Sequence, residues 1–531
     1  MLALATASVT SIDVADARKQ PKVAGKGSAS GSATPMTDAG SGSAAGSADE
    51  DEESGGSGTH TTAPGDKKAR PAWLRERLAA AIASKPKLGR AKIGVAVLDL
   101  ATGEEIYSHD ADAGLNLASN TKLLTSAAAL ATLGGGFRWR TAVYADKLDD
   151  ATGTVEGDLY IRGRGDPLLS VADLRGLADD IAARGVRTVT GKLRVDTSYF
   201  DGATEPPHYD EQKGEHAGFR APVASLGVAR GTVTVVVTAE PGGTARVTLE
   251  PETEQVHLRK VSVTTVTTGR SRIKVDQNGG AKGRTELDVS GQIRAVDGSF
   301  EQRRRLDDPA RAAAEILRRE LATRGVKIAD RSYSVAVVPP AAKLVATHDS
   351  APLALVIREM NKLSDNYVAE TVLKTLGAET RASPGPASWA DGTAAVRAYL
   401  GTLGIAAGSY RADNGSGLFG ASEVSAHQVL EILAAAYHDY RIGPDLLASL
   451  PVAGVDGTLA KRWHDHPARG RVRAKTGTLD KVIALAGYAG VDGAHQLAFV
   501  IVSNDIPGGQ RPAARALADD MVDAMVAYLA P

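Results

Sequence analysis

The middle of the chain differs in character from the sequence on both sides of it. Residues 147–345 contain short segments rich in β-branched residues and separated by turns, with helical patterns over 171–185 and 309–324. The flanking sequence instead has long helical patterns, and a further group of strand patterns lies close to the C-terminus. An α+β domain interrupted by a long β-rich insertion is the simplest fold that accounts for this order.

The two flanking parts, 71–146 and 346–531, are expected to form one domain together. In the first part, apolar periodicity predicts a helix over 71–84, strands over 93–98 and 105–108, and a helix over 119–133. In the second part, the same signals predict helices over 351–378, 389–404 and 424–437, strands over 471–478, 482–491 and 496–504, and a final helix over 510–529.

The N-terminal residues have a composition that does not form a core. Residues 24–70 are rich in Gly, Ser, Ala and Thr and carry an acidic block over 49–53, which predicts a disordered linker. Residues 1–23 are interpreted as a possible remnant of an export signal, because Ala5-Thr6-Ala7 matches the small-x-small cleavage pattern. No run of about 18 apolar residues occurs, so no transmembrane helix is predicted.

Charge and cysteine content exclude several classes of function. The chain has 62 Lys and Arg against 63 Asp and Glu, so no overall field attracts nucleic acid, and no nucleic-acid partner is expected. It has no cysteine, which excludes disulfides, Cys-ligated zinc, iron–sulfur clusters and thiol nucleophiles. Any covalent catalysis must therefore use another nucleophile.

Ser119 and Lys122 form an S-x-x-K motif at the start of a predicted helix. Residues three apart share one helix face, so the lysine amine can reach the serine hydroxyl and take its proton. The helix N-terminus adds partial positive charge beside the alkoxide that forms. The spacing is common by chance, however, since 84–87 and 271–274 match it too. Taken alone, Ser119 is either a nucleophile or an ordinary N-cap.

Two further short motifs follow in the second flanking part. Ser364-Asp-Asn366 is the only S-x-N in the sequence and lies in a helical pattern, where it could equally be a polar turn or a surface position. Lys475-Thr-Gly477 is the only K-T-G and lies in a strand pattern. Alternation along that strand places Lys475 and Gly477 on one side, so a cation sits beside a position without a side chain.

The three motifs in this order resemble those of a known enzyme family. From about residue 72 to the C-terminus, the chain is similar to the D-alanyl-D-alanine carboxypeptidase/endopeptidases, the low-molecular-mass class C penicillin-binding proteins of the penicillin-binding protein 4 type. The long gap between Ser119 and Ser364, more than twice that between Ser364 and Lys475, also resembles this family. The segments that carry the likeness are 117–125, 157–160, 165–167, 195–202, 221–226, 360–366, 414–418 and 450–459.

The resemblance implies a β-lactamase/transpeptidase-like fold and a serine-type peptidase that acts through an acyl-enzyme. Ser119 would attack the D-Ala–D-Ala carbonyl, and Lys122 would accept its proton. Ser364 would relay a proton to the leaving amine, Asn366 would hold Lys122 and the substrate amide, and Lys475 would attract the terminal carboxylate.

The resemblance also implies the remaining parts of the site and the partners. Thr476, Gly477 and Thr478 would bind the substrate, and the backbone N–H groups of Ser119 and Thr478 would form the oxyanion hole. No cofactor and no metal is implied. The expected partners are peptidoglycan stem peptides and, as covalent inhibitors, β-lactam antibiotics, and the expected location is periplasmic or otherwise extracytoplasmic.

Some positions depart from the family pattern, and other functions stay open. The family usually has Ser and a basic residue where Phe419 and Gly420 stand, so a preference for a diaminopimelate-containing stem is not implied. Asp210 and Glu211 are the candidates for an acidic contact from the insertion. His464-Asp-His466 is expected to be a surface loop rather than a metal site. The alternative functions are a β-lactamase and a non-catalytic scaffold that binds muropeptides.

Overall fold

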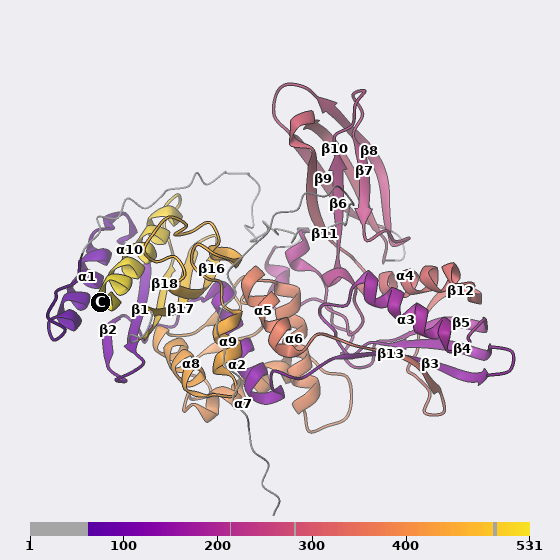
Figure 1. Cartoon of the computed structure of the whole chain (residues 1–531), viewed down its shortest axis with the longest axis horizontal. Coiled ribbons are helices and arrows are strands. Elements are labelled where there is room, and N and C mark those ends of the chain that lie inside the picture. The colour runs from indigo at the N-terminus through magenta and orange to yellow at the C-terminus, as the bar shows by residue number, and fades with distance from the viewer. Residues whose placement is uncertain (1–61, 213, 281–282, 492–495, 531) are drawn as a thin grey trace, which may run out of the picture. The chain divides into compact units, whose positions relative to one another are not determined.

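The computed structural model describes residues 62–530 apart from 213, 281–282 and 492–495 (Figure 1). The export-signal remnant expected over 1–23, and the expected linker as far as residue 61, lie outside the described residues. The first helix, α1, covers Arg70–Ala83, one residue before the expected start.

Strands from both flanking parts form one antiparallel sheet with the order β16-β17-β18-β1-β2. Its members are β1 (Lys92–Asp99), β2 (Glu105–His109), β16 (Val472–Leu479), β17 (Val482–Gly490) and β18 (Gln496–Asn504). The register between β1 and β18 places Val95 opposite Ile501 and Ala96 opposite Val500. This pairing joins strands of the two flanking parts in one sheet.

Helices cover both faces of this sheet (Figure 1). α1 packs against the C-terminal helix on one face, while the helix that follows Ser119 lies among the helices on the other face. Besides α1, the helices are α2 (Thr121–Leu133), α5 (Leu353–Leu363), α6 (Asn366–Thr380), α7 (Trp389–Thr402), α8 (Ala426–His438), α9 (Gly443–Ser449) and α10 (Arg511–Leu529). The short strands β14 (Arg411–Ala412) and β15 (Ser422–Glu423) pair separately.

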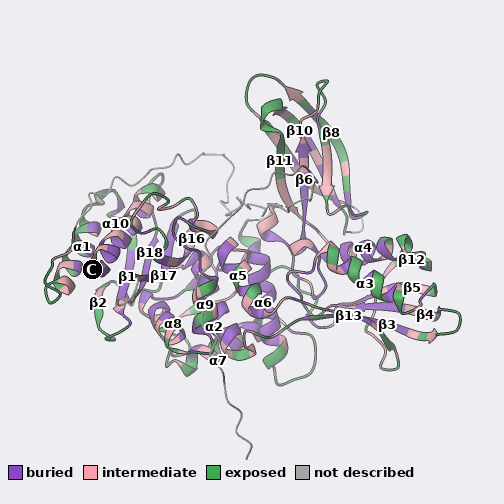
Figure 2. Cartoon of the chain, viewed as in Figure 1, coloured by how far each residue is buried: buried purple, intermediate pink, exposed green. Residues whose placement is uncertain are grey.

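The two faces of the sheet carry side chains of different size. Val95, Leu485 and Phe499 belong to the core under α1 and α10, whereas Ala96 and Ala486, their neighbours along the strands, belong to the core under α2 and α8. Side chains alternate between the faces of a strand, so the sequence itself assigns them. The alanine side lets α2 approach the sheet closely, and Figure 2 shows β17 and β18 buried between the layers.

The insertion contains a mixed sheet flanked by two helices, with the order β12-β5-β4-β3-β13. Its elements are β3 (Arg140–Asp149), β4 (Thr154–Arg162), α3 (Val171–Ala183), β5 (Thr188–Asp196), α4 (Pro309–Thr323), β12 (Lys327–Val335) and β13 (Lys343–Asp349). Arg140 and Asp349 lie opposite each other in β3 and β13, so the chain enters and leaves this sheet at neighbouring positions. The boundaries expected at 146/147 and 345/346 stay predictions.

Two small sheets complete the insertion, with the orders β11-β6-β7 and β8-β10-β9. Their strands are β6 (Thr232–Thr238), β7 (Arg246–Glu250), β8 (Val256–Val266), β9 (Arg272–Gly279), β10 (Thr285–Arg294) and β11 (Ser299–Arg305). Val235, Val289 and Ile316 belong to one core that these sheets share with the mixed sheet and its helices. The α+β fold class predicted from the sequence is confirmed.

The prediction of a single helix over 351–378 is wrong. α5 ends at Leu363 and α6 begins at Asn366, because Ser364 adopts the left-handed conformation with φ of 58°. The side chain of Asp365 then accepts a hydrogen bond from the N–H of Val368 (3.1 Å) and caps α6. Helical periodicity alone did not reveal this break, since apolar residues continue on both sides of it.

Replacement of Leu485 by Ala is expected to lower the free energy of unfolding by about 2–5 kcal/mol. Leu485 is fully buried under α1 and α10, and its removal leaves a cavity in that core. Urea denaturation measures the change. Leu344→Ala is the control, because Leu344 is 56% exposed and its truncation should change stability by no more than about 0.5 kcal/mol. Equal effects of the two substitutions would contradict the described packing.

Candidate active site

Ser119 lies in a single-turn 3₁₀ helix, Ala118–Asn120, directly before α2. Ala118 has a φ of 47°, so the backbone turns sharply just before the serine. Lys122 lies in the first turn of α2, where its Nζ is 3.1 Å from Ser119 Oγ. The expected pairing of serine and lysine across one helix face is therefore present in the structure.

The Lys122 amine is fully buried and donates hydrogen bonds to oxygens from three segments. Its Nζ is 3.1 Å from Ser119 Oγ, 2.7 Å from Asn366 Oδ1 and 3.0 Å from the carbonyl oxygen of Ser416. Burial lowers the pKa of Lys122 to about 7, although the negative charges of Glu370 and Asp365 oppose this change. An amine with this pKa is neutral in part near neutral pH and can then accept a proton.

The S-x-N motif lies at the break between α5 and α6. The left-handed backbone of Ser364 directs its hydroxyl to a second lysine, Lys475, whose Nζ donates to Ser364 Oγ at 2.8 Å. Asn366, the first residue of α6, places its Oδ1 on Lys122 and donates from Nδ2 to the Phe219 carbonyl at 3.2 Å. The motif therefore connects both lysines, and it also contacts the insertion.

Lys475 is fully buried on the face of β16 that is turned toward α2. It lies opposite Ala486, which belongs to the core under α2. Burial and then the neighbouring charge of Lys122 hold the pKa of Lys475 well below its ordinary value. Gly477 lies on the same face, and a Cβ there would be 2.7 Å from the carbonyl oxygen of Leu117. The glycine of K-T-G lets β16 lie directly against the serine turn.

The second half of β16 has an open edge beside this turn. The N–H of Ala474 donates to Pro451 (3.0 Å), and Val472 accepts from Ala453 (2.9 Å), so the outer edge is paired as far as Ala474. Successive residues of a strand direct their backbone N–H and C=O groups to opposite edges, so those of Thr476 and Thr478 lie on the same outer edge as those of Ala474. The Thr476 carbonyl there accepts from Lys475 Nζ at 2.9 Å. The Thr476 hydroxyl lies 2.8 Å from the hydroxyl of Thr458.

Glu370 and Ser416 belong to the site, but the sequence motifs did not single them out. Ser416 holds Lys122 through its carbonyl, and its N–H donates to Glu370 Oε1 at 2.8 Å. Glu370 lies one turn after Asn366 on α6 and is fully buried. The i,i+4 spacing from Asn366 was a usable signal, because it places the carboxylate on the same face of the helix.

Phe419 and Gly420 are covered by a segment of the insertion. The rings of Phe419 and Tyr209 meet edge to face with centroids 5.9 Å apart, and the guanidinium of Arg220 lies over both rings. The N–H of Gly420 donates to Glu211 Oε2 at 3.1 Å. Of the two acidic candidates in the insertion, Glu211 therefore contacts this loop, whereas Asp210 is exposed.

The remaining sequence candidates lie elsewhere. Ser84 donates to the Ala81 carbonyl at the end of α1, and Ser271 donates to Asp297, so neither serine is paired with the lysine of its motif in the way that Ser119 is. His464 is exposed and contacts Asp465. Among the described residues, no group of three or more His, Asp or Glu side chains could hold a metal ion.

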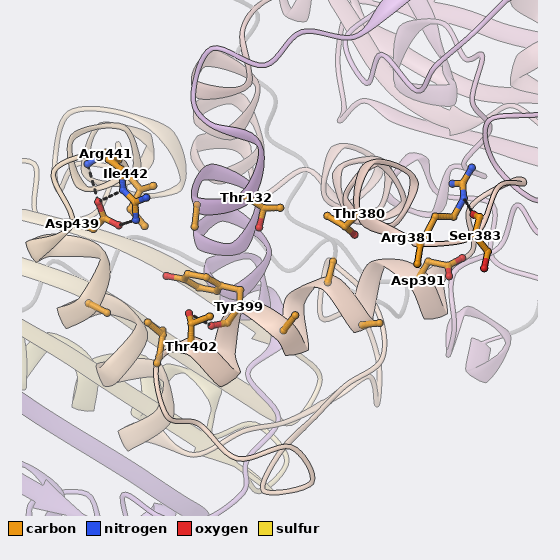
Figure 3. Close-up of a pocket in the computed structure, with 17 residues that line it drawn as sticks. Thr132, Thr380, Arg381, Ser383, Asp391, Tyr399, Thr402, Asp439, Arg441 and Ile442 are labelled. Atoms are coloured by element: carbon orange, nitrogen blue, oxygen red, sulfur yellow. Dashed lines mark hydrogen bonds and ion pairs between the residues drawn. The ribbon is translucent and has the colours of Figure 1, made fainter.

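A cavity of about 780 Å³ lies at the other end of α2 (Figure 3). It is lined by Thr132 in the last turn of α2, by Tyr399 of α7 and, at its ends, by Arg381 and Arg441. α2 rises about 1.5 Å per residue, so Thr132 is roughly 18 Å from the serine turn along the helix axis. The motif residues do not line this cavity.

The family model of the D-Ala-D-Ala carboxypeptidase 3 (S13) family matches residues 74–528. The chain belongs to this family. It is 35% identical over 476 residues to the D-alanyl-D-alanine carboxypeptidase of Actinomadura sp. (strain R39), covering 87% of this chain and 86% of that protein. It is 30% identical to carboxypeptidase DacB of Mycolicibacterium smegmatis, covering 84% of this chain and 83% of that protein.

The solved structures agree on the fold. Penicillin-binding protein 4 of Haemophilus influenzae superposes with a TM-score of 0.69 at 23% identity, covering 83% of this chain and 98% of that chain. A second structure of the same protein, in complex with a β-lactam, superposes with a TM-score of 0.64. The family membership makes this chain a serine-type D-Ala-D-Ala carboxypeptidase, a penicillin-binding peptidase that acts on peptidoglycan. The resemblance inferred from the motifs is confirmed.

Gly477→Ala is expected to slow acylation by a fluorescent penicillin by about 100-fold, because the new Cβ would displace β16 from the Leu117 carbonyl and so misplace Lys475 against Ser119. Stopped-flow or gel-based labelling measures the rate constant. Gly401→Ala in α7 is the matched control. A Cβ there would meet no atom of the described residues within 4 Å, so labelling should keep its wild-type rate. Wild-type labelling by the Gly477 variant would contradict the close contact.

Proposed function

We propose that the carboxypeptidase reaction runs through an acyl-enzyme on Ser119, with peptidoglycan stem peptides as substrates. The observation that carries the proposal is the buried Lys122 amine, 3.1 Å from Ser119 Oγ and with its pKa lowered to about 7. A serine hydroxyl is a weak nucleophile until a neighbouring base accepts its proton. Lys122 is that base, because it is close to the hydroxyl and can be neutral near neutral pH.

The chemical step then needs few groups. Ser119 Oγ bonds to the carbonyl carbon of the D-Ala–D-Ala bond as its proton moves to Lys122 Nζ, and the C–N bond breaks as the leaving amine takes up a proton. Ser364 is the proposed relay for that proton, because its hydroxyl accepts from Lys475 at 2.8 Å. Water attacks the acyl-enzyme in the second half of the reaction and releases the shortened stem peptide.

The open edge of β16 is the proposed binding site for the substrate backbone. Alternation directs the N–H of Thr478 to that edge, where it and the N–H of Ser119 would form the oxyanion hole. Each such donor lowers a barrier by about 2.7–4 kcal/mol. Lys475 supplies positive potential for the terminal carboxylate, Thr476 and Thr478 are the proposed donors to it, and Gly477 lets this part of β16 lie against the Ser119 turn. Asn366 holds Lys122 and the substrate amide.

The same site would also open cross-links and take up β-lactams. An endopeptidase reaction uses the same acyl-enzyme, with an amine of the neighbouring stem peptide in place of D-alanine as the leaving group. A β-lactam presents a carbonyl and a carboxylate to the same groups and leaves a slowly hydrolysed acyl-enzyme. Because the substrate is in the cell wall, we infer that the protein is extracytoplasmic, and the periplasm is the proposed compartment. No helix among the described residues is long and apolar enough to cross a membrane.

Labelling with a fluorescent penicillin tests the nucleophile. Wild-type protein is expected to take up one label per chain, and Ser119→Ala none, because the acyl bond forms on Ser119 Oγ. Ser84→Ala and Ser271→Ala are matched controls from the other two S-x-x-K motifs and should label like the wild type. Label that persists in the Ser119 variant would overturn the assignment, and rapid turnover of a chromogenic cephalosporin would favour a β-lactamase instead.

The rate of acylation is expected to fall as the pH decreases through about 7. The base must be neutral, and protonation of Lys122 below its pKa of about 7 removes it, so the rate should drop tenfold per pH unit on the acid side. The pH profile of single-turnover penicillin acylation measures this limb. A flat profile down to pH 5 would contradict the role of Lys122 as the base.

A further inference from the structure

Glu370 is a fully buried acidic residue that none of the proposed chemical steps uses. Its Oε1 accepts a hydrogen bond from the N–H of Ser416 at 2.8 Å. Its Oε2 accepts from the N–H of Gly415 at 3.0 Å and from the indole N–H of Trp389 at 2.9 Å. The carboxylate therefore fixes two successive peptide groups of the loop 414–417 against α6 and α7.

These contacts indicate that Glu370 is ionised. Burial raises the pKa of Glu370 above its ordinary value, but the N–H groups of Ser416, Gly415 and Trp389 oppose this change. Each of these groups donates a proton, and an ionised carboxylate is an acceptor only, whereas a protonated one would direct its own O–H toward a donor. Charge-assisted hydrogen bonds of this kind are about twice as strong as neutral ones.

Ser416 of this loop connects Glu370 to the proposed base, Lys122. The residue whose N–H is bonded to Glu370 is Ser416, and the carbonyl of the same residue accepts from Lys122 Nζ at 3.0 Å. Removal of the carboxylate would free this loop at the point where it holds the amine. Ser119 and Asn366 hold the amine from the other sides.

Glu370 also adds a fixed negative charge close to Lys122. The other charged groups around the amine are Asp365 at the start of α6 and Lys475 on β16. Glu370 is the larger of the two negative contributions that raise the pKa of Lys122 against the effect of burial.

The other side chains next to Glu370 would not supply a negative charge if Glu370 lost its own. Trp389 on α7 is neutral, and the pKa of Tyr209 from the insertion is raised well above its ordinary value, so this phenol is neutral too. Lys374, one turn further along α6, is paired with Asp201 of the insertion at 2.5 Å. Glu370 is thus the anion on the side of Lys122 that faces the 414–417 loop.

We propose that Glu370 is a positioning residue for the base: it holds the Ser416 carbonyl against the Lys122 amine and places a fixed negative charge close to that amine. This proposal rests on the proposed function, in which Lys122 is the base. The Glu370 side chain has two separable effects: its position affects the rate of penicillin acylation, and its charge affects the pH profile of that rate.

Two substitutions separate these effects. Glu370→Gln removes the charge and turns an amide NH₂ toward N–H donors, so the plateau rate of penicillin acylation should fall at least about tenfold. Its acid limb should move to lower pH by about one unit, because Lys122 loses a neighbouring negative charge. Glu370→Asp keeps the charge but withdraws the carboxylate by one methylene, so the rate should fall while the acid limb stays at its wild-type pH.

Glu379→Gln is the matched control on the same helix. Glu379 bonds to Arg164 and to the hydroxyl of Tyr199, away from Lys122, so both the rate and the acid limb should equal those of the wild type. A residue that only stabilises the loop would slow both Glu370 variants without moving either acid limb.

The outcomes are distinct. An unshifted acid limb in Glu370→Gln, or a wild-type plateau rate in Glu370→Asp, overturns the proposal while the proposed function stands. Failure of the wild-type protein to label in the same series overturns the proposed function and this inference with it. If Glu370→Gln does not fold, as judged by circular dichroism, the aspartate variant tests the positioning role through its plateau rate, and a wild-type plateau there overturns the proposal.

Discussion

The removal of the Lys122 amine from water is the condition on which the site depends. A buried ammonium group is unfavourable unless charges and hydrogen bonds compensate for the lost solvent, and otherwise its pKa falls. Here burial lowers the pKa to about 7, while oxygens from the Ser119 turn before α2, from α6 and from the 414–417 loop keep the amine in place. The segments that supply these oxygens are far apart in the sequence, so the amine can be placed only after the domain has assembled.

That assembly explains why small residues surround the site. The alanines on one face of the central sheet let α2 approach the strands closely, and Gly477 lets β16 lie against the serine turn. Gly417 has the same function on the other side, since a Cβ there would lie 1.9 Å from the carbonyl oxygen of Ala118. Small residues at these points permit the close packing that excludes water from both lysines.

The insertion is part of the site as well as a separate set of sheets. Its Phe219 carbonyl accepts from Asn366, and Arg230 donates to Asp365 at 3.0 Å, in the middle of the S-x-N motif. Arg230 itself has a φ of 56°, so a strained turn of the insertion holds the break between α5 and α6. Lys374 and Asp201 form a further, partly buried contact between α6 and the insertion. These contacts give the long β-rich segment a structural role at the centre of the enzyme.

Much of the fold and the residues of the proposed catalytic site could be predicted from the sequence, because they depend on local pattern. Alternation in β17 and β18 determined which side chains face α2, and the spacing of Ser119 and Lys122 brought them together on one helix face. The break at Ser364 was missed, because apolar periodicity continues through it and its left-handed backbone depends on contacts with β16 and the insertion. Glu370 was missed for a different reason: a carboxylate in a helical pattern usually faces solvent. The sequence by itself determined the chemical groups and their order along the chain. It also determined which side chains share a face of a strand or helix, since this follows from periods of two and 3.6 residues. Only the tertiary structure decided which groups are buried together, and burial is what lowers the pKa of a lysine enough for it to act as a base.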